Sequence, residues 1–128
     1  MNPSGKARQV EIEHIFTQLE FDRFAYLSGD DNPIHVDPEF ASRTRFGRTV
    51  AHGLLLCSKL RALIDQLVPG GRLLEQSVMF EAPTYAGDRM HLRAWITAHE
   101  NNATQFGVEV KRVDDNIVTC SGEGTVTL

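Results

Sequence analysis

Apolar residues occupy nearly every side of the helix that the sequence predicts between Leu54 and Val68. The apolar positions are Leu54, Leu55, Leu56, Cys57, Leu60, Leu63, Ile64, Leu67 and Val68. A helix that is apolar all round is normally buried, because none of its faces is suited to water. Pro69, Gly70 and Gly71 follow directly and end it. The rest of the chain is therefore expected to enclose this helix.

Alternating apolar and polar residues predict strands on both sides of the central helix, because a half-buried strand has a period of two. The expected strands begin near residue 9, where Val10 and Ile12 alternate with polar neighbours, and continue after the helix. Those after the helix cover about 77–80, 90–96, 106–110 and 117–126. One strand, two or three helices and four strands predict an α+β fold, in which an antiparallel sheet buries one face against the central helix.

Two shorter helices are expected between the first strand and the central helix. Thr17 followed three residues later by Glu20 has the spacing of a capping box, and Gly29 offers a C-terminal stop. Asp37 followed by a proline predicts the start of another short helix. Pro33 predicts a shaped loop between them, because its ring prevents a helix from continuing and favours an extended preceding residue.

Length and composition limit the class of protein. The chain has 128 residues and a formal net charge of −4, so we expect one domain over residues 1–128, with residues 1–7 flexible. The acidic balance argues against binding to nucleic acid, which requires clustered positive charge. No apolar run approaches the roughly 20 residues of a membrane helix, and no signal peptide is recognisable, so a cytoplasmic location is predicted. Cys57 and Cys120 lie far apart and are expected to be free, buried thiols.

The most polar and most constrained stretch is the loop from Gly29 to His35. Asp30 and His35 lie on either side of Pro33, so both side chains can turn toward one point. A carboxylate that accepts a proton and an imidazole that holds or passes one could together grip a water molecule. Asn32 is expected to hold the loop through side-chain hydrogen bonds to the backbone. Alternatively, Asp30 simply follows the helix end and His35 is a partly exposed loop residue.

A second candidate site lies immediately before the buried helix, at His52 and Gly53. Gly53 lets another molecule approach the backbone closely, and the first N–H groups of a helix carry the positive end of its dipole without an intrahelical partner. Such groups can form an oxyanion hole. The alternative is that Gly53 only permits tight packing of helix against sheet. Ser58 could reach back to a carboxylate, or be a small residue that lets the helix lie close.

A metal site would have to draw on four residues of these two segments, Asp30, Asp31, His35 and His52. Their spacing differs from the two-histidine helical spacing of zinc enzymes, and the Asp-Asp-Asn run lacks the glycine and terminal glutamate of a calcium loop. No metal ion is therefore expected. Arg43, Arg45 and Arg48 form a basic cluster in an acidic chain, which either meets the phosphates of an anionic ligand or is a solvated loop.

Taken together, these segments strongly resemble the MaoC-like (R)-specific enoyl-CoA hydratases. The family pattern is an aromatic or apolar lead-in followed by Gly-Asp-x-Asn-Pro-x-His, which stands here as GDDNPIH from Gly29 to His35, and AHGLL follows at Ala51 to Leu55. The resemblance covers nearly the whole chain and implies a hot-dog fold, in which a bent antiparallel sheet wraps a long central helix. Members of the family act as homodimers, and a second copy would also cover an exposed strand edge.

The resemblance assigns roles to individual residues. It implies that Asp30 and His35 are the catalytic pair that holds the attacking water. Gly53 matches the glycine whose backbone N–H receives the thioester oxygen. Ser58 matches a serine that helps to fix the catalytic aspartate, and Asn32 matches the asparagine that shapes the motif.

The implied reaction is the reversible syn addition of water to a trans-2-enoyl-CoA, giving the (R)-3-hydroxyacyl-CoA without a metal or an organic cofactor. His52 and Leu54, on either side of the glycine, are expected to contact the substrate. Three alternatives stay open: a hot-dog acyl-thioesterase, a dehydratase acting on acyl-carrier-protein substrates, and a non-catalytic acyl-thioester-binding module. The intact Asn-Pro-x-His after Asp30 disfavours the thioesterase, and a non-catalytic module has no reason to keep Asp30, His35 and Gly53 together.

Overall fold

The computed structural model describes residues 8–128, so the flexible segment predicted for residues 1–7 lies outside the described residues. The strands are β1 (Gln9–Ile15), β2 (Arg72–Phe80), β3 (Arg89–Glu100), β4 (Ala103–Arg112) and β5 (Val118–Thr127). The helices are α1 (Gln18–Ser28), α2 (Pro33–Val36), α3 (Pro38–Ser42) and α4 (Gly53–Leu67). The strands form one antiparallel sheet in the order β1-β3-β4-β5-β2. The predicted α+β class is confirmed.

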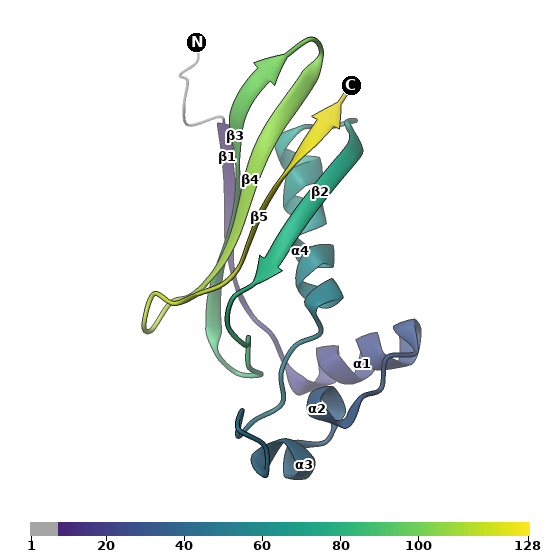
Figure 1. The fold of residues 1–128 in the computed structure, drawn as a ribbon, viewed down its shortest axis with the longest axis vertical. Coiled ribbons are helices and arrows are strands. Elements are labelled where there is room, and N and C mark those ends of the chain that lie inside the picture. The colour runs from purple at the N-terminus through teal and green to yellow at the C-terminus, as the bar shows by residue number, and fades with distance from the viewer. Residues whose placement is uncertain (1–7) are drawn as a thin grey trace.

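Helix α4 runs along the sheet, and the three shorter helices gather at the end of the sheet where α4 begins (Figure 1). The buried residues of α4 are Leu55, Leu56, Leu60, Leu63, Ile64 and Leu67. The sheet residues that join them in one apolar core include Met90, Leu92, Ala94, Phe106, Val108, Val110, Cys120 and Val126. Burying one leucine side chain stabilises the fold by about 1.5–3 kcal/mol, so this core is what holds the helix against the sheet. The arrangement is the hot-dog fold that the resemblance implied.

The expectation that α4 is buried on every side is wrong along one stripe. Leu54, Ser58, Ala62 and Asp65 are exposed, and residues spaced three or four apart lie on the same face of a helix. The sheet therefore covers most of α4 but leaves this stripe uncovered in the single chain. Cys57, beside the stripe, is only half-buried, which corrects the prediction of two buried thiols.

Both cysteines are free, and Cys120 is buried as predicted. Burial raises the pKa of the Cys57 thiol, and it raises the pKa of Cys120 to about 12. A thiol reacts as a nucleophile in its thiolate form. Neither cysteine therefore offers a nucleophile at neutral pH.

The predicted ends of α1 are confirmed. The Thr17 hydroxyl accepts the Glu20 N–H at 3.1 Å, and the Glu20 carboxylate accepts the Thr17 N–H at 3.1 Å, which completes the capping box. Gly29 ends the helix in the left-handed region with φ 81°, and its N–H bonds to Ala25 O at 2.9 Å. The cap predicted at Asp37 is also present, because its carboxylate accepts two N–H groups of α3 at 3.1 Å.

The segment from Pro33 to Val36 forms one helical turn, α2, where the sequence predicted a loop. Proline is well suited to the first position of a helix, because the N–H that it lacks would have no partner there. Asn32 precedes the turn, and its side-chain oxygen accepts the Ile34 N–H at 3.1 Å. His35 therefore lies on a helical turn.

Within residues 8–128, no helix is long and apolar enough to span a membrane.

Candidate active site

Asp30 and His35 lie side by side at the junction of α1 and α2. His35 Nε2 is 3.8 Å from Asp30 Oδ2, which is too long for a direct hydrogen bond. The spacing still allows a water oxygen to lie about 2.8 Å from both atoms. The His35 side chain is 15% exposed and that of Asp30 is 56% exposed, so the pair faces solvent from the carboxylate side. The structure thus brings together the two residues that were expected to form a pair.

The proton on the His35 ring is positioned by Val50. His35 Nδ1 lies 2.7 Å from Val50 O, and a carbonyl oxygen only accepts, so Nδ1 carries the proton. In the neutral ring, Nε2 then has a free lone pair on the side of Asp30. The Val50 N–H donates to Ile34 O at 3.0 Å and fixes the same helical turn. Val50 was not identified from the sequence, because a backbone carbonyl leaves no signal in residue type.

The main chain of His35 is held by Gln18, the first residue of α1. Gln18 Nε2 donates to His35 O at 2.9 Å, and Gln18 Oε1 accepts the Thr49 hydroxyl at 2.6 Å. Thr49 is 4% exposed, so the hydroxyl is shielded from water. Gln18 therefore ties together α1, α2 and the segment that leads to α4. No motif marks these residues, because the contact joins positions 31 apart in the chain.

Asp30 itself is held mainly through its backbone. Its N–H donates to Ser28 Oγ at 3.1 Å, while its Oδ1 lies 3.5 Å from the Asn32 nitrogen, a weak contact. Asn32 shapes the turn as predicted, by accepting the Ile34 N–H. The carboxylate of Asp30 is thus presented to solvent with few side-chain restraints.

His52 lies against His35 and bonds to Asp30. The two imidazole rings are stacked, with centroids 3.9 Å apart and planes 23° apart. His52 Nε2 is 2.9 Å from Asp30 O, and since the carbonyl accepts, Nε2 is the protonated nitrogen. Burial lowers the pKa of His52, the neighbouring His35 lowers it further, and the bond to Asp30 O opposes the shift. At 2% exposure, His52 is enclosed by protein.

Gly53 is the first residue of α4 and directly follows His52. The N–H groups of Leu55 and Leu56 bond to His52 O, whereas that of Gly53 precedes the first intrahelical bond and has no partner within the helix. A Cβ atom at Gly53 would lie 2.6 Å from Phe80 Cζ, so the Phe80 ring packs directly against the glycine. Gly53 thus permits close packing, and it leaves a helix N–H unpaired within α4.

A hollow of about 500 Å³ adjoins Gly53. Its lining includes Arg45, Phe46, Ala51, Gly53, Phe80 and Thr84. Of the three clustered arginines, Arg43 pairs with a glutamate of α3 at 3.4 Å, and Arg48 pairs with Asp88 at 3.1 Å. The Arg45 guanidinium lies 4.6 Å from the centre of the Phe46 ring, and among residues 8–128 it forms no ion pair. Arg45 is therefore the member of the cluster whose charge is free at the hollow.

Two predicted site residues lie apart from the catalytic pair. The Ser58 hydroxyl donates to Leu55 O at 2.7 Å, within its own helix. The structure does not bring it into contact with Asp30. Leu54 lies on the exposed stripe of α4, directly after Gly53. The support expected from Ser58 and the substrate contact expected from Leu54 stay predictions.

Asp30, His35 and His52 place one potential metal ligand atom each within 4.8 Å of one another. Ring nitrogens bind a metal through lone pairs that converge on the ion. The two imidazoles are stacked almost parallel, and the His52 Nε2–H already donates a hydrogen bond to Asp30 O. This arrangement fits a water held by Asp30 and His35 better than an ion bound by all three residues.

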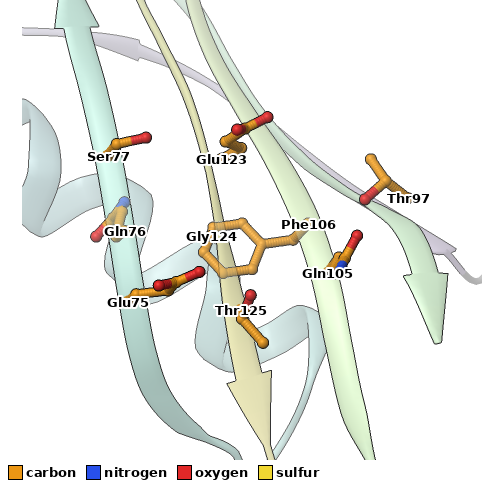
Figure 2. A pocket seen from close by; sticks show the side chains of 9 residues that line it. All are labelled: Glu75, Gln76, Ser77, Thr97, Gln105, Phe106, Glu123, Gly124 and Thr125. Atoms are coloured by element: carbon orange, nitrogen blue, oxygen red, sulfur yellow. The ribbon is translucent and has the colours of Figure 1, made fainter. Parts of the chain in front are cut away.

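A second hollow, of about 330 Å³, lies on strands β2 to β5 (Figure 2). The Phe106 ring lies against Gly124 there, since a Cβ atom at Gly124 would be 2.6 Å from Phe106 Cζ. The carboxylates of Glu75 and Glu123 lie in its lining, which contains no histidine, cysteine or cationic residue. An acidic wall without a base or a cation is poorly suited to an anionic thioester.

The chain is similar in sequence and in structure to known enzymes. The profile of the family described as MaoC like domain matches residues 1–117. The (R)-specific enoyl-CoA hydratase of Aeromonas caviae is 42% identical over 93 residues, which make up 71% of this chain and 69% of that protein. The mitochondrial 3-hydroxyacyl-[acyl-carrier-protein] dehydratase of Arabidopsis thaliana is 30% identical over 118 residues, 89% of this chain and 71% of that protein. The solved (R)-hydratase from A. caviae, involved in PHA biosynthesis, matches with a TM-score of 0.89 and 31% identity over 94% of each chain.

Proposed function

Because the chain belongs to the MaoC-like domain family, we propose that it works as an (R)-specific enoyl-CoA hydratase with Asp30 and His35 as its catalytic pair. Its reaction is the reversible addition of water to a trans-2-enoyl-CoA, which makes it a hydro-lyase. The observation that carries the residue assignment is the 3.8 Å spacing of His35 Nε2 and Asp30 Oδ2. One water can bond to both atoms at that spacing.

In this mechanism, His35 Nε2 accepts a proton from the shared water while the Asp30 carboxylate orients it. The water oxygen forms a bond to C3 of the enoyl group, and the proton taken from the water returns to C2. Both additions start from a water held on one side of the alkene, so the addition is syn. The proton on His35 Nδ1, bonded to Val50 O, is what leaves Nε2 free to act as the base.

The thioester oxygen is proposed to bond to the N–H of Gly53. Negative charge develops on this oxygen when water adds to C3, and the N-terminus of α4 presents a positive dipole end to it. Loss of one such donor typically costs about 2.7–4 kcal/mol of transition-state stabilisation. The Phe80 ring occupies the space that a Cβ atom at Gly53 would take, so the thioester carbonyl is proposed to reach the N–H beside this ring.

The hollow beside Gly53 is the proposed binding site of the acyl-thioester substrate. Its volume of about 500 Å³ lies within the roughly 300–1,000 Å³ typical of small-molecule sites. Arg45 lines this hollow, and its guanidinium is proposed to bind a phosphate of the thiol carrier to which the acyl group is attached. Both coenzyme A and the phosphopantetheine of an acyl carrier protein contain such a phosphate.

The decisive experiment is to mix the protein with crotonyl-CoA and follow the conjugated absorbance together with free thiol. Loss of absorbance without thiol release supports hydration. Thiol release would instead support a thioesterase, which could polarise the same carbonyl at Gly53 but would cleave the thioester bond. If neither signal changes, and crotonyl-acyl carrier protein is also inert, the hydratase proposal fails.

A homodimer that joins two sheets through β2 is also proposed. Strand β2 is an edge of the sheet, and Leu74, Met79 and Phe80 are 52%, 65% and 49% exposed. The other edge, β1, carries Glu11 and Glu13 along its middle, whereas the charged residues of β2, Arg72 and Glu75, lie before Met79 and Phe80. Charge on an edge strand opposes pairing with another chain.

A cytoplasmic location is also proposed, and fractionation of the producing cells tests it.

A further inference from the structure

We propose that His52 is a positioning residue, a neutral imidazole that holds both Asp30 and His35 in place without touching the substrate. The inference rests on the proposed function, because it concerns the same catalytic pair. It differs from the substrate contact that the sequence suggested for His52. Four observations carry it: the burial of the ring, its bond to Asp30, its stacking on His35 and its place at the start of α4.

His52 anchors the backbone of Asp30. The Asp30 side chain is 56% exposed, and among residues 8–128 it has only the 3.5 Å contact with the Asn32 nitrogen and the 3.8 Å approach to His35. The bond from His52 Nε2 to Asp30 O, at 2.9 Å, is made by a residue that is 2% exposed. A buried donor keeps its geometry because water does not compete for it. His52 therefore restrains a carboxylate that stands in an otherwise exposed turn.

His52 also supports the ring of His35. The rings of His52 and His35 are stacked at 3.9 Å, and the Phe24 ring packs on His52 at 4.8 Å with the Phe21 ring further away at 6.5 Å. Phe21 and Phe24 belong to α1, His35 belongs to α2, and His52 itself directly precedes α4. Three helices thus meet at one imidazole. A change of ring at this position would move His35 as well as Asp30.

The neutral state of His52 suits this role. Within the described part of the chain, the titratable groups that face its ring are Asp30 and His35, while α1 contributes the aromatic rings of Phe21 and Phe24. Burial and the neighbouring His35 both disfavour a charge on His52, and the positive end of the α4 dipole does the same. His35 becomes an imidazolium when it takes the proton of the water. A second cation 3.9 Å away would oppose that step, and a neutral ring does not.

The donor nitrogen is what distinguishes histidine from phenylalanine here. His52 Nδ1 is buried and has no hydrogen-bond partner among the described residues. An unpaired buried nitrogen is destabilising, and a phenylalanine would fill the space without one. The Nε2–H bonded to Asp30 O is therefore the contribution that only the imidazole makes.

Two variants separate the donor from the ring. His52→Phe keeps a flat ring and removes the donor, whereas His52→Gln keeps an N–H donor and removes the ring. His99→Gln, at the exposed end of β3, is the matched control. We expect kcat on crotonyl-CoA to fall about 100-fold in His52→Phe, with KM within about twofold, because misplacing a catalytic group by 1 Å can cost that much. His52→Gln should recover part of the loss.

A rise in KM at unchanged kcat would overturn the proposal, because it would mean that His52 contacts the substrate. Unchanged kcat in both His52 variants would overturn it as well. Neither result would bear on the hydratase assignment, which the wild-type assay tests separately.

Nitrogen-15 NMR of the wild-type imidazoles tests the proposal even if the variants fail to fold. We expect His52 to be the neutral, Nε2-protonated tautomer, with a titration midpoint below the ordinary value of 6.5. A His52 ring protonated on Nδ1, or charged at pH 7, would overturn the proposal whatever the activity.

Discussion

The Nδ1–H of His35 donates to the carbonyl oxygen of Val50 at 2.7 Å. This bond determines which nitrogen of the catalytic imidazole is available to a water, because it leaves the lone pair on Nε2. Nε2 in turn lies 3.8 Å from Asp30 Oδ2. A backbone atom 15 residues further along the chain thus sets the protonation geometry of the proposed base.

Replacing either member of the catalytic pair should abolish most of the activity and leave the fold intact. We expect Asp30→Asn and His35→Gln to lower the hydration rate of crotonyl-CoA by roughly 10² to 10⁴ fold, the usual contribution of a positioned acid or base. Circular dichroism checks the fold, and His99→Gln serves as the control. A folded variant that hydrates at the wild-type rate would show that the assignment of the pair is wrong.

Gly53→Ala should lower kcat while changing stability little. The added methyl group would lie 2.6 Å from Phe80 Cζ, so the half-exposed Phe80 ring has to swing aside and the thioester oxygen loses its close approach to the N–H. We expect kcat to fall about 10² fold, as when an oxyanion donor is lost. Asp65→Ala, on the exposed stripe of α4, is the control. Equal rates for Gly53→Ala and Asp65→Ala would contradict the oxyanion role.

Arg45→Ala should weaken binding of substrates that carry a phosphate. We expect KM for crotonyl-CoA to rise about three- to tenfold, equivalent to about 0.7–1.4 kcal/mol, because Arg45 has no competing ion pair among residues 8–128. Crotonyl-N-acetylcysteamine lacks the phosphates, so its kinetics should not change. Arg43→Ala is the matched control, since Arg43 already pairs with Glu39 at 3.4 Å. An equal effect on both substrates would refute a phosphate contact at Arg45.

A charge on strand β2 should break the proposed dimer. We expect Met79→Glu to shift the mass measured by sedimentation equilibrium from dimer to monomer at micromolar concentration, because two copies of the charge would meet at the edge. Ile15→Glu, at the end of β1, should leave the mass unchanged. A wild-type protein that is monomeric at this concentration would contradict the proposal directly.

His52 should make the fold less stable in mild acid. Burial lowers the pKa of His52 below its ordinary value of 6.5, so between 6.5 and the folded-state pKa the unfolded chain takes up a proton that the native state does not. The free energy of unfolding then falls as the pH is lowered through that window. Urea denaturation at pH 7.5 and 5.5 should show a smaller loss for His52→Phe than for the wild type. Equal losses in the two proteins would mean that His52 titrates normally.

Local patterns predicted the ends of the elements because those ends depend on neighbouring residues. The capping box of Thr17 and Glu20 and the stop at Gly29 are confirmed, since a cap bonds atoms only three or four positions apart. The prediction of a loop from Gly29 to His35 is wrong in its second half, because Pro33 starts the single turn of α2. The same residue type fits both structures, and the bond from the Val50 N–H to Ile34 O holds the turn in place.

Periodicity and short spacing in the sequence are enough to predict the central apolar helix, the alternating strands and the pairing of Asp30 with His35. The rest of the site depends on how distant segments pack. Gln18 reaches His35 O, and His52 stacks on His35, through contacts between segments that are distant in the chain. The sheet also decided which stripe of α4 stays exposed. Such contacts leave no local periodicity, since they arise only when the helices pack at one end of the sheet.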